Sequence, residues 1–423
     1  MNILLLGSGG REHAFAWRLS QSQHCDALYI APGNAGTELF GTNLAISPND
    51  FPALKTAALD KKIDLVICGP EEPLVRGAKD YFTGDPDLHH IRFVGPSQEA
   101  AQLEGSKAYA KKFMAEFDIP TAGYREFLPD TLEEGIAYLE NQPTPIVLKA
   151  DGLAAGKGVV ILDDRDAAKQ ELIAMLSGKF GVASEKVVIE EFLSGIEFSV
   201  FVATDGEDYH LLPVAKDYKR IGEGDTGLNT GGMGSISHPP FVDQAMMEKV
   251  EEQIIKPTIT GIKARGLDYR GFIFFGLISV AGEPKVIEYN CRMGDPETQS
   301  VFARLKSDLV ELCLAIADGS VKKTSLEIDE RQVATVVLVS GGYPGAYEKG
   351  KEIVGIEQIT DSLVMHAGTK RNESGQLLTN GGRVLAVTSY GKTFQEALTI
   401  SNMNAAKIQF EGANYRQDIG FDL

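Results

Sequence analysis

The chain has 423 residues, of which 43% are apolar and 24% charged, an ordinary globular composition that allows two to four domains. Acidic residues outnumber basic ones by 59 to 41, and the net charge of −18 argues against general affinity for nucleic acid or anionic membranes. The absence of a CxxC pair, a basic leader or a long apolar run argues against a zinc or disulfide framework, secretion and membrane insertion, and favours the reducing cytoplasm.

The N-terminal residues predict an α/β domain. An apolar run at 2–6 ends in a glycine-rich turn, and a helical pattern follows from Glu12 to Leu19. Helical patterns also separate the next apolar runs, which favours a parallel sheet whose domain ends near residue 104. The further predicted strands lie at 27–30, 63–68 and 91–94.

The middle of the chain, 105–326, predicts a second domain that carries a small α+β lid at about 121–192. A glycine loop and a helix interrupt its strand-like runs, which lie at 146–149, 158–162, 187–190 and 197–203. Residues 216–240 show little periodicity, and a loop of this length is usually functional or disordered. Strands at 271–280 and 285–289 are expected to resume the core.

Residues 327–423 predict a separate, mixed β/α domain. Its expected strands lie at 333–339, 363–366 and 383–388, and its expected helix lies at 393–408. The Asn380-Gly-Gly382 segment is typical of a hairpin turn. The fold class expected from all three parts is therefore α/β and α+β multidomain.

The first chemical motif is the glycine-rich turn from Gly7 to His13. It lies where a strand passes into a helix, so free backbone N–H groups and the helix dipole favour a phosphate. A dinucleotide fingerprint would need glycine at Glu12, and an acid where Ala31 begins the Ala-Pro-Gly-Asn segment, so NAD is not expected. A tight turn without a ligand explains this motif equally well.

The second motif is a glycine-rich hairpin loop that runs from Lys149 to Gly158 and could close over a triphosphate. It is not a Walker loop, because three residues separate Gly152 from Gly156 and a glycine occupies the position of the metal-binding hydroxyl. Lys149 ends a strand and could reach phosphate oxygens as a point charge. A flexible surface hairpin with solvated lysines is the alternative.

The third motif places Glu288, Asn290 and Arg292 at alternate positions, so a strand would turn them to one face. Carboxylate and amide oxygens suit Mg²⁺, which completes its shell with phosphate and water, and arginine suits a carboxylate or phosphate. An exposed strand edge with three polar residues is the alternative.

Two weaker features remain. The stretch from Glu190 to Glu197 could present backbone groups to adenine, although a solvated turn is the commoner meaning of such a string. The glycine-rich segment 216–234 could cover a substrate, or be a disordered linker. His13 and His366 lie in no metal-ligand spacing and are interpreted as packing or capping residues.

Together these motifs resemble the ATP-grasp superfamily and, within it, the glycinamide ribonucleotide synthetase family. The resemblance covers nearly the whole chain through Gly7–His13, Pro32–Asn34, Gly69–Leu74, Lys149–Gly158, Asp225–Gly234, Arg292–Gln299, Ser340–Gly345 and Asn380–Arg383. It implies an N-terminal parallel-sheet domain, an ATP-grasp domain with a small lid and a C-terminal mixed β/α domain.

The resemblance also implies an activity, namely an ATP-dependent ligase of purine biosynthesis. Such a ligase joins glycine to 5-phosphoribosylamine through glycyl phosphate and yields glycinamide ribonucleotide, ADP and phosphate. ATP and Mg²⁺ or Mn²⁺ are the expected cofactors. A cytoplasmic monomer without nucleic-acid or membrane partners is the expected state.

For the nucleotide, the resemblance implies that Lys107 and Lys149 contact phosphates, Glu197 contacts ribose, and Glu288 and Asn290 hold the metal. The loop residues implied to cover the phosphates are Gly152, Gly156, Lys157 and Gly158, and those implied to face adenine are Glu190, Phe192 and Leu193. For the substrates, it implies catalytic roles for Asp217 and Arg292. Substrate contacts are implied for Gly9, Gly10, Asn229, Gly294 and Asp295.

Three residues depart from the family pattern. Tyr218 stands where histidine is usual, Leu228 where proline is usual, and Met293 where an aromatic residue is common. Three other functions stay open: a different ATP-grasp ligase, a nucleotide-dependent oxidoreductase and a noncatalytic nucleotide sensor. A biotin-linked carboxylase should require bicarbonate, an oxidoreductase should bind NAD, and a sensor should bind ATP without substrate-dependent turnover.

Overall fold

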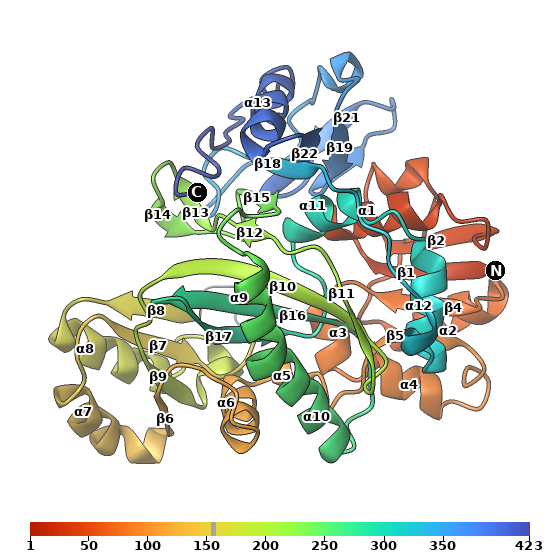
Figure 1. The fold of residues 1–423 in the computed structure, drawn as a ribbon. Helices are drawn as coiled ribbons and strands as arrows, with labels where there is room; N and C mark the ends of the chain where they lie inside the picture. Colours follow the sequence, from red (N-terminus) through yellow and green to blue (C-terminus); the bar gives the residue numbers. More distant parts are fainter. Residues whose placement is uncertain (154–157) are drawn as a thin grey trace.

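The computed structural model describes residues 1–153 and 158–423. Figure 1 shows the N-terminal part, in red and orange, continuing into the green strands of the middle part, with the yellow lid at one end and the blue C-terminal part above. Parallel and antiparallel sheets occur together, so the expected α/β and α+β multidomain class is confirmed. Among the described residues, no helix is long and apolar enough to cross a bilayer.

The N-terminal part is a parallel sheet covered by helices. Its strands, in the order β3-β2-β1-β4-β5, are β1 (Asn2–Gly7), β2 (Ala27–Pro32), β3 (Thr42–Asn43), β4 (Leu65–Cys68) and β5 (Arg92–Pro96). Its helices are α1 (Gly10–Leu19), α2 (Phe51–Asp60), α3 (Glu71–Val75) and α4 (Ala78–Gly84). β4 is buried along its whole length, because a parallel strand between helical layers has no solvent face. The predicted strands of this part are confirmed.

The core of the middle part extends the same sheet with antiparallel strands. Its strands are β10 (Ile196–Thr204), β11 (Tyr209–Leu211), β16 (Tyr269–Val280) and β17 (Glu283–Asn290), and its helices are α5 (Gln102–Gly105), α6 (Lys107–Glu116), α9 (Gln244–Val250) and α10 (Lys256–Ala264). β16 pairs with β5, which makes one nine-stranded sheet of the two parts. The expected strand at 197–203 therefore lies in this sheet, as β10, and not in the lid.

The lid is a separate four-stranded antiparallel sheet in the order β6-β9-β7-β8. It contains β6 (Tyr124–Phe127), β7 (Ile146–Ala150), β8 (Val159–Leu162), β9 (Val187–Glu191), α7 (Leu132–Glu140) and α8 (Arg165–Leu176). Leu139 and Leu172 from the two helices pack with Leu148 of β7 in a hydrophobic cluster of the lid's own. This separate core lets the lid form a compact body beside the large sheet.

The C-terminal part is built on a five-stranded antiparallel sheet in the order β12-β15-β18-β22-β19. Its elements are β12 (Lys216–Asp217), β15 (Gly234–Ser237), β18 (Gln332–Val339), β19 (Leu363–His366), β22 (Arg383–Gly391) and α13 (Phe394–Ala405), with α11 (Glu297–Arg304) and α12 (Leu309–Asp318) preceding β18. The first two strands come from the segment expected to be a loop, so the middle part supplies two strands to this sheet.

Smaller hairpins complete this part of the molecule: β13 (Arg220–Gly222) pairs with β14 (Thr226–Asn229), and β20 (Thr369–Arg371) pairs with β21 (Leu377–Thr379). The predicted hairpin turn at Asn380–Gly382 is wrong. Its flanking strands β21 and β22 do not pair with each other, because β21 pairs with β20 while β22 lies between β18 and β19.

Candidate active site

A buried charged cluster lies where phosphates were expected. Lys149 on β7 places Nζ 2.9 Å from Oε2 of Glu190 on β9 and 3.2 Å from the carbonyl oxygen of Ile287. Nζ of Lys111 on α6 lies 3.2 Å from the same Glu190 oxygen, and burial lowers the pKa of Lys111 to about 8. One carboxylate thus pairs with two ammonium groups and neutralises only one of their two charges. The positive charge that remains favours binding of a polyphosphate.

Lys107 opens α6 and faces the glycine loop. Its Nζ lies 3.4 Å from the carbonyl oxygen of Gly152, and burial lowers its pKa. The helix start is held by Asp151, whose carboxylate accepts a hydrogen bond from the Ala108 amide at 2.7 Å. An anion bound near Lys107 would restore the charge that burial disfavours.

The glycine loop itself is partly described. Gly158 closes the hairpin, because its carbonyl oxygen accepts a hydrogen bond from the Ala150 amide at 2.8 Å. A Cβ at Gly152 would lie 3.0 Å from Ala183, so a side chain there would crowd the neighbouring segment. The other two loop residues of interest, Gly156 and Lys157, lie outside the described residues.

The connection from the lid to the core holds the residues expected to face adenine and ribose. Glu190 turns its side chain to the lysines, and its backbone lies in β9 between β6 and β7, so the residues that follow β9 are the ones left to meet a base. Phe192 follows β9 and is 38% exposed, and Leu193 is half-buried. Glu197 on β10 pairs with Nζ of Lys219 at 3.1 Å, and this ammonium holds the pKa of Glu197 below its usual value.

Glu288 and Asn290 share one face of β17. Glu288 lies opposite Gly276, where a Cβ would approach its Cγ to 3.1 Å, so the glycine leaves room for the glutamate. Burial raises the pKa of Glu288, but nearby cations outweigh burial and leave the pKa lowered; they are Lys219, Lys149, Lys107 and Arg292. The Asn290 Oδ1 accepts a hydrogen bond from Arg292 at 3.1 Å. An ionised carboxylate and a fixed amide oxygen form a donor set that fits a hard divalent cation.

Arg292 forms two ion pairs within the protein, which its position in the sequence did not predict. Its Nη2 lies 2.9 Å from Oε1 of Glu104, and its Nε lies 3.3 Å from Oε2 of Glu71. Burial raises the pKa of Glu104 to about 7 despite this contact. Since Glu71 belongs to the N-terminal part, the guanidinium joins two parts of the molecule beside the site.

Two acidic side chains, Asp217 and Glu297, are brought together by the fold. Burial raises the pKa of Glu297, and the negative charge of Asp217 raises it further. Burial also raises the pKa of Asp217, although Lys219 opposes this effect. A Cβ at Gly294 would lie 2.4 Å from Oε2 of Glu297, so the glycine makes space for that carboxylate. Two carboxylates that resist ionisation would be relieved by a bound ammonium group.

Glu297 was not singled out from the sequence. It directly follows Gly294-Asp295-Pro296 in the Arg292–Gln299 segment that carries the family resemblance, so its position in that segment was the available signal. Its partner Asp217 lies far away along the chain, and only packing reveals that the two interact.

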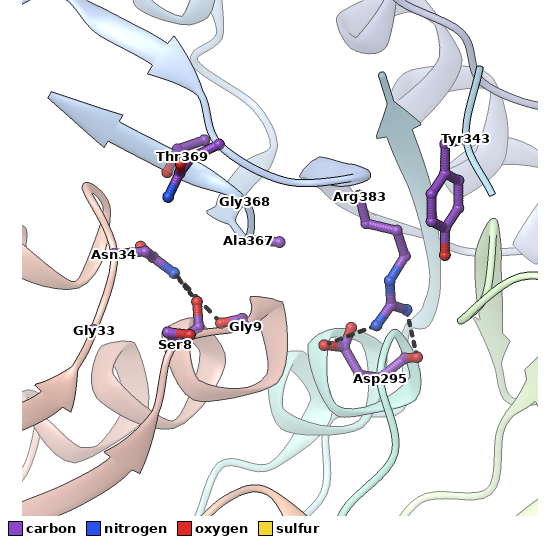
Figure 2. Close-up of a pocket in the computed structure, with 11 residues that line it drawn as sticks. Ser8, Gly9, Gly33, Asn34, Asp295, Tyr343, Ala367, Gly368, Thr369 and Arg383 are labelled. Atoms are coloured by element: carbon purple, nitrogen blue, oxygen red, sulfur yellow. Dashed lines mark hydrogen bonds and ion pairs between the residues drawn. The ribbon is translucent and has the colours of Figure 1, made fainter. Parts of the chain in front are cut away.

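A cavity of about 340 Å³ lies between the N-terminal and C-terminal parts. Figure 2 shows Ser8 and Gly9 on one side, with Arg383 pointing toward Asp295 on another. The other residues that line it are Gly33, Asn34, Tyr343, Ala367, Gly368, Thr369 and Asn380. The cavity therefore combines a glycine turn, hydroxyl and amide groups, and one guanidinium, which is a suitable lining for a phosphorylated sugar.

The glycine turn is held by the protein's own acids. The Gly9 amide donates to Oε2 of Glu12 at 2.6 Å, and the Arg11 amide donates to Oδ2 of Asp295 at 3.3 Å. Gly10 begins α1, and a Cβ there would lie 2.5 Å from Nε2 of Gln299. The first and second motifs of the sequence thus lie in different places, with the Gly7–His13 turn at the cavity.

Asn34 locks this wall of the cavity. Its Nδ2 donates to the carbonyl oxygens of Ser8 and His366, both at 2.9 Å, and its Oδ1 accepts from the Gly36 amide at 2.8 Å. His13 and His366 stack with ring centroids 5.5 Å apart, as expected of packing residues. These contacts bind the N-terminal turn to the C-terminal sheet.

The structure also shows where Asn229 lies, and where the three residues lie that depart from the family pattern, Tyr218, Leu228 and Met293. Asn229 lies on the exposed hairpin strand β14 and does not line the cavity. Tyr218 is 1% exposed and donates its hydroxyl to Oδ1 of Asp422 at 2.8 Å, which shows why a tyrosine is accommodated. Leu228 is 65% exposed, and Met293 is buried in the large hydrophobic core.

Comparison with known proteins agrees with this architecture. Models of the phosphoribosylglycinamide synthetase N domain, ATP-grasp (A) domain and C domain match residues 1–104, 105–298 and 333–422. The chain is 48% identical over its full length to a phosphoribosylamine–glycine ligase of Salmonella typhi and 47% identical to one of Escherichia coli K12, covering 98% of each.

Solved structures show the same fold. A phosphoribosylamine–glycine ligase from Thermotoga maritima matches 99% of this chain and 100% of its own, with 36% identity and a TM-score of 0.85. A biotin carboxylase domain from Hydrogenobacter thermophilus, in complex with MgADP and bicarbonate, has a TM-score of 0.73 at 15% identity over 100% of this chain and 93% of its own, a likeness of fold alone. The chain belongs to the phosphoribosylglycinamide synthetase family, whose N, ATP-grasp and C domains it carries in order.

Proposed function

We propose that this chain is an ATP-dependent phosphoribosylamine–glycine ligase that forms glycinamide ribonucleotide, ADP and phosphate in purine biosynthesis. The observation that carries the proposal is the position of Glu288. Its carboxylate interacts with Lys107 and Lys149 on the nucleotide side and with Lys219 and Arg292 on the substrate side. A metal-binding carboxylate between these two groups is what phosphoryl transfer from ATP to a carboxylate requires.

ATP is assigned to the space between lid and core. Lys149 and Lys107 would neutralise phosphate oxygens, and the loop that includes Gly152, Gly156, Lys157 and Gly158 would cover them. The connection at Phe192 and Leu193 would meet the adenine, and Glu197 the ribose. The net positive charge of the lysine cluster supports this assignment.

Glu288 and Asn290 would hold the divalent metal, Mg²⁺ or Mn²⁺, because their oxygens share one face of β17. A cation bound there neutralises charge on the transferring phosphoryl group. Arg292 keeps the Asn290 amide oriented, and the surrounding ammonium groups keep Glu288 ionised.

The two substrates would occupy the two sides of Asp295. The acidic pair Asp217 and Glu297 would hold the ammonium group of glycine, since an added positive charge offsets their mutual repulsion. The cavity beside Gly9 and Arg383 would hold the phosphoribosyl group of the amine. Asn229 is assigned to the covering hairpin rather than to the cavity wall.

The reaction would run in two transfers. A glycine carboxylate oxygen attacks the γ-phosphorus of ATP, the bond to the β-phosphate oxygen breaks, and glycyl phosphate and ADP form. The amine nitrogen of phosphoribosylamine then attacks the glycyl carbonyl, and the C–O bond to phosphate breaks while the released phosphate takes up the amine proton. The lid, which carries Lys149 on β7, would close over the phosphates and exclude water, which would otherwise hydrolyse the acyl phosphate.

Omission assays test this function. ADP and phosphate release are measured with ATP, Mg²⁺, freshly made phosphoribosylamine and glycine, and each component is left out in turn. We expect turnover only with all of them present. Turnover that is indifferent to glycine, or that needs bicarbonate in its place, would refute the proposed reaction.

Three properties accompany the proposal. We assign the chain to the cytoplasm as a monomer, in keeping with its free cysteines and small-molecule substrates. We place the domain bounds at 1–104, 105–326 and 327–423, with the lid at about 121–192. The strands β12 and β15 then belong by sequence to the middle domain and by pairing to the C-terminal sheet.

A further inference from the structure

One carboxylate, Asp422, holds the residues on both sides of Asp217. Its Oδ2 lies 3.2 Å from Nζ of Lys216, and its Oδ1 accepts the hydroxyl hydrogen bond of Tyr218 at 2.8 Å. The Lys216 ammonium also lies 4.7 Å from the centroid of the Tyr218 ring. Asp422, Lys216 and Tyr218 therefore form one compact charged cluster, which is remote from the ATP lysines in sequence.

This cluster lies behind the acidic pair. Because side chains alternate along an extended segment, Lys216 and Tyr218 leave the backbone on the side opposite to Asp217. The Lys216 ammonium is still close enough to favour the ionised forms of Asp217 and Glu197. Tyr218 is 1% exposed and packs in the core, whereas Asp217 interacts with Lys219 and Glu297 in the site. The backbone at Asp217 is thus fixed from the face opposite to the substrates.

Residues 416–418, close to Asp422 in the sequence, also hold the β13–β14 hairpin, which follows β12 along the chain. Arg416 is 1% exposed and donates Nη1 to Oδ1 of Asp225 at 2.6 Å and to the carbonyl oxygen of Arg220 at 3.1 Å. The Gly224 amide donates to Oδ2 of Asp418 at 2.6 Å. The β13–β14 hairpin is therefore attached at its base and its tip to residues 416–418.

We propose that Asp422 is a positioning residue that sets the place of Asp217 for glycine through Lys216 and Tyr218. The segment 416–422, which we call the clasp, holds the loop 216–229 against the C-terminal sheet. The tyrosine at 218 takes part because its hydroxyl reaches the Asp422 carboxylate. This inference rests on the proposed function, in which Asp217 receives the glycine ammonium.

The clasp predicts a selective kinetic effect. Asp422 contacts Lys216 and Tyr218 directly, and it affects the ATP side through the charge of Lys216 near Glu197. Its loss should therefore displace the glycine side of the site and change ATP binding far less. Loss of a residue that contributed only to overall stability would change the KM values for glycine and ATP to the same extent. A charge-assisted contact of this kind corresponds to about a tenfold change in an equilibrium constant.

The test compares Asp422→Ala, Asp422→Asn and Tyr218→Phe with Glu411→Gln, an exposed carboxylate of the C-terminal part that pairs with Lys351. We expect Asp422→Ala to raise the KM for glycine about tenfold and to change the KM for ATP far less. The Asn side chain of Asp422→Asn can still accept a hydrogen bond from Tyr218, so the KM for glycine of this variant should lie between those of Asp422→Ala and the parent. The KM values of Glu411→Gln should match those of the parent. Equal changes in the two KM values, or no difference from Glu411→Gln, would overturn the proposal.

A second measurement does not depend on turnover. The Met233 amide donates to the Tyr218 carbonyl oxygen at 2.7 Å, and the Tyr218 amide donates to the Gly234 carbonyl oxygen at 3.0 Å. In Asp422→Ala these two amides should exchange with deuterium faster than in the parent, while the lid amides stay unchanged. Unchanged exchange at both positions would overturn the clasp, whereas failure of the parent in the omission assay would overturn the proposed function alone.

Discussion

Arg383 of β22 contacts Asp295 at two points, the backbone carbonyl oxygen and the side-chain carboxylate. Its Nη1 lies 2.6 Å from the carbonyl oxygen of Asp295, and its Nη2 lies 3.3 Å from Oδ2. Arg383 lowers the pKa of the Asp295 carboxyl against the effect of burial. The C-terminal part thus supplies a guanidinium to a cavity that it lines together with the N-terminal residues Ser8, Gly9, Gly33 and Asn34 (Figure 2).

Replacing Arg383 by alanine should weaken binding of the phosphorylated substrate. The variant removes the cation assigned to the phosphoribosyl group and leaves Asp295 without its guanidinium partner. We expect the KM for phosphoribosylamine to rise by about 100-fold, with the KM for ATP little changed. Arg371→Ala, in the same domain and 44% exposed at its side chain, is the matched control. Equal effects of the two variants would contradict the assignment.

Replacing Glu288 by alanine should impair metal binding. The variant loses the carboxylate of the proposed donor pair, and we expect kcat/KM to fall by at least about 100-fold and the Mg²⁺ concentration for half-maximal rate to rise. Glu283→Ala on the same strand removes an exposed carboxylate that pairs with Lys249. A normal Mg²⁺ dependence in Glu288→Ala would refute its role as a metal ligand.

Replacing Glu297 by glutamine should alter the pH dependence of glycine use. A carboxyl group whose pKa is raised loses its charge as the pH falls, so kcat/KM for glycine should fall on the acidic side in the parent. Without Glu297, the remaining acid Asp217 loses a repelling neighbour, and the acidic limb should move to lower pH while the KM for glycine rises.

The control for the acidic pair is Glu207→Gln, which changes an exposed glutamate whose carboxylate lies 3.5 Å from Nζ of Lys263. Its pH profile should overlay that of the parent. If Glu297→Gln keeps both the parent profile and the parent KM for glycine, the acidic pair does not receive the ammonium group.

The stacked histidines predict acid sensitivity of the join between the N-terminal and C-terminal parts. Burial lowers the pKa of His13 to about 3 and that of His366 to about 4, whereas an unfolded histidine titrates near 6.5. The unfolded chain therefore binds more protons below that pH. The stability that these groups contribute is present above pH 6.5 and decreases as the pH falls, by roughly 1.4 kcal/mol per pH unit for each histidine.

Thermal unfolding between pH 7 and pH 5 measures this effect. We expect His366→Gln to be less stable than the parent at pH 7 and to lose less stability on acidification. His24→Gln, whose imidazole is about half exposed, should keep the slope of the parent. A slope in His366→Gln equal to that of the parent would show that the buried ring does not govern the acid response.

Local sequence patterns predicted most of the strands. The run at 2–6 lies within β1, and the run at 363–366 is β19, because an apolar alternation or a buried run needs only its own residues to be recognised. The misassignments concern pairing. The run at 197–203 was grouped with the strands of the lid, although it lies beyond the expected lid bounds of about 121–192, and it pairs with β16. The Asn380–Gly382 turn does not join paired strands.

The sequence by itself determined the kinds of chemistry available: a glycine turn, a lysine-bearing hairpin loop, and Glu288 and Asn290 at alternate positions of one strand. Each of these depends on residues only a few positions apart, so short-range geometry is enough to predict it.

Only the tertiary structure decided which distant groups act together. Arg383 meets Asp295 across 88 positions, and Tyr218 meets Asp422 across 204. Tertiary packing creates these contacts: the segment between β17 and α11 meets β22, and the C-terminal tail meets the residue that follows β12. No spacing in the sequence encodes the distance between two side chains so far apart. The same packing raises the pKa of Glu297 next to Asp217, because burial and a like charge act through space rather than along the chain.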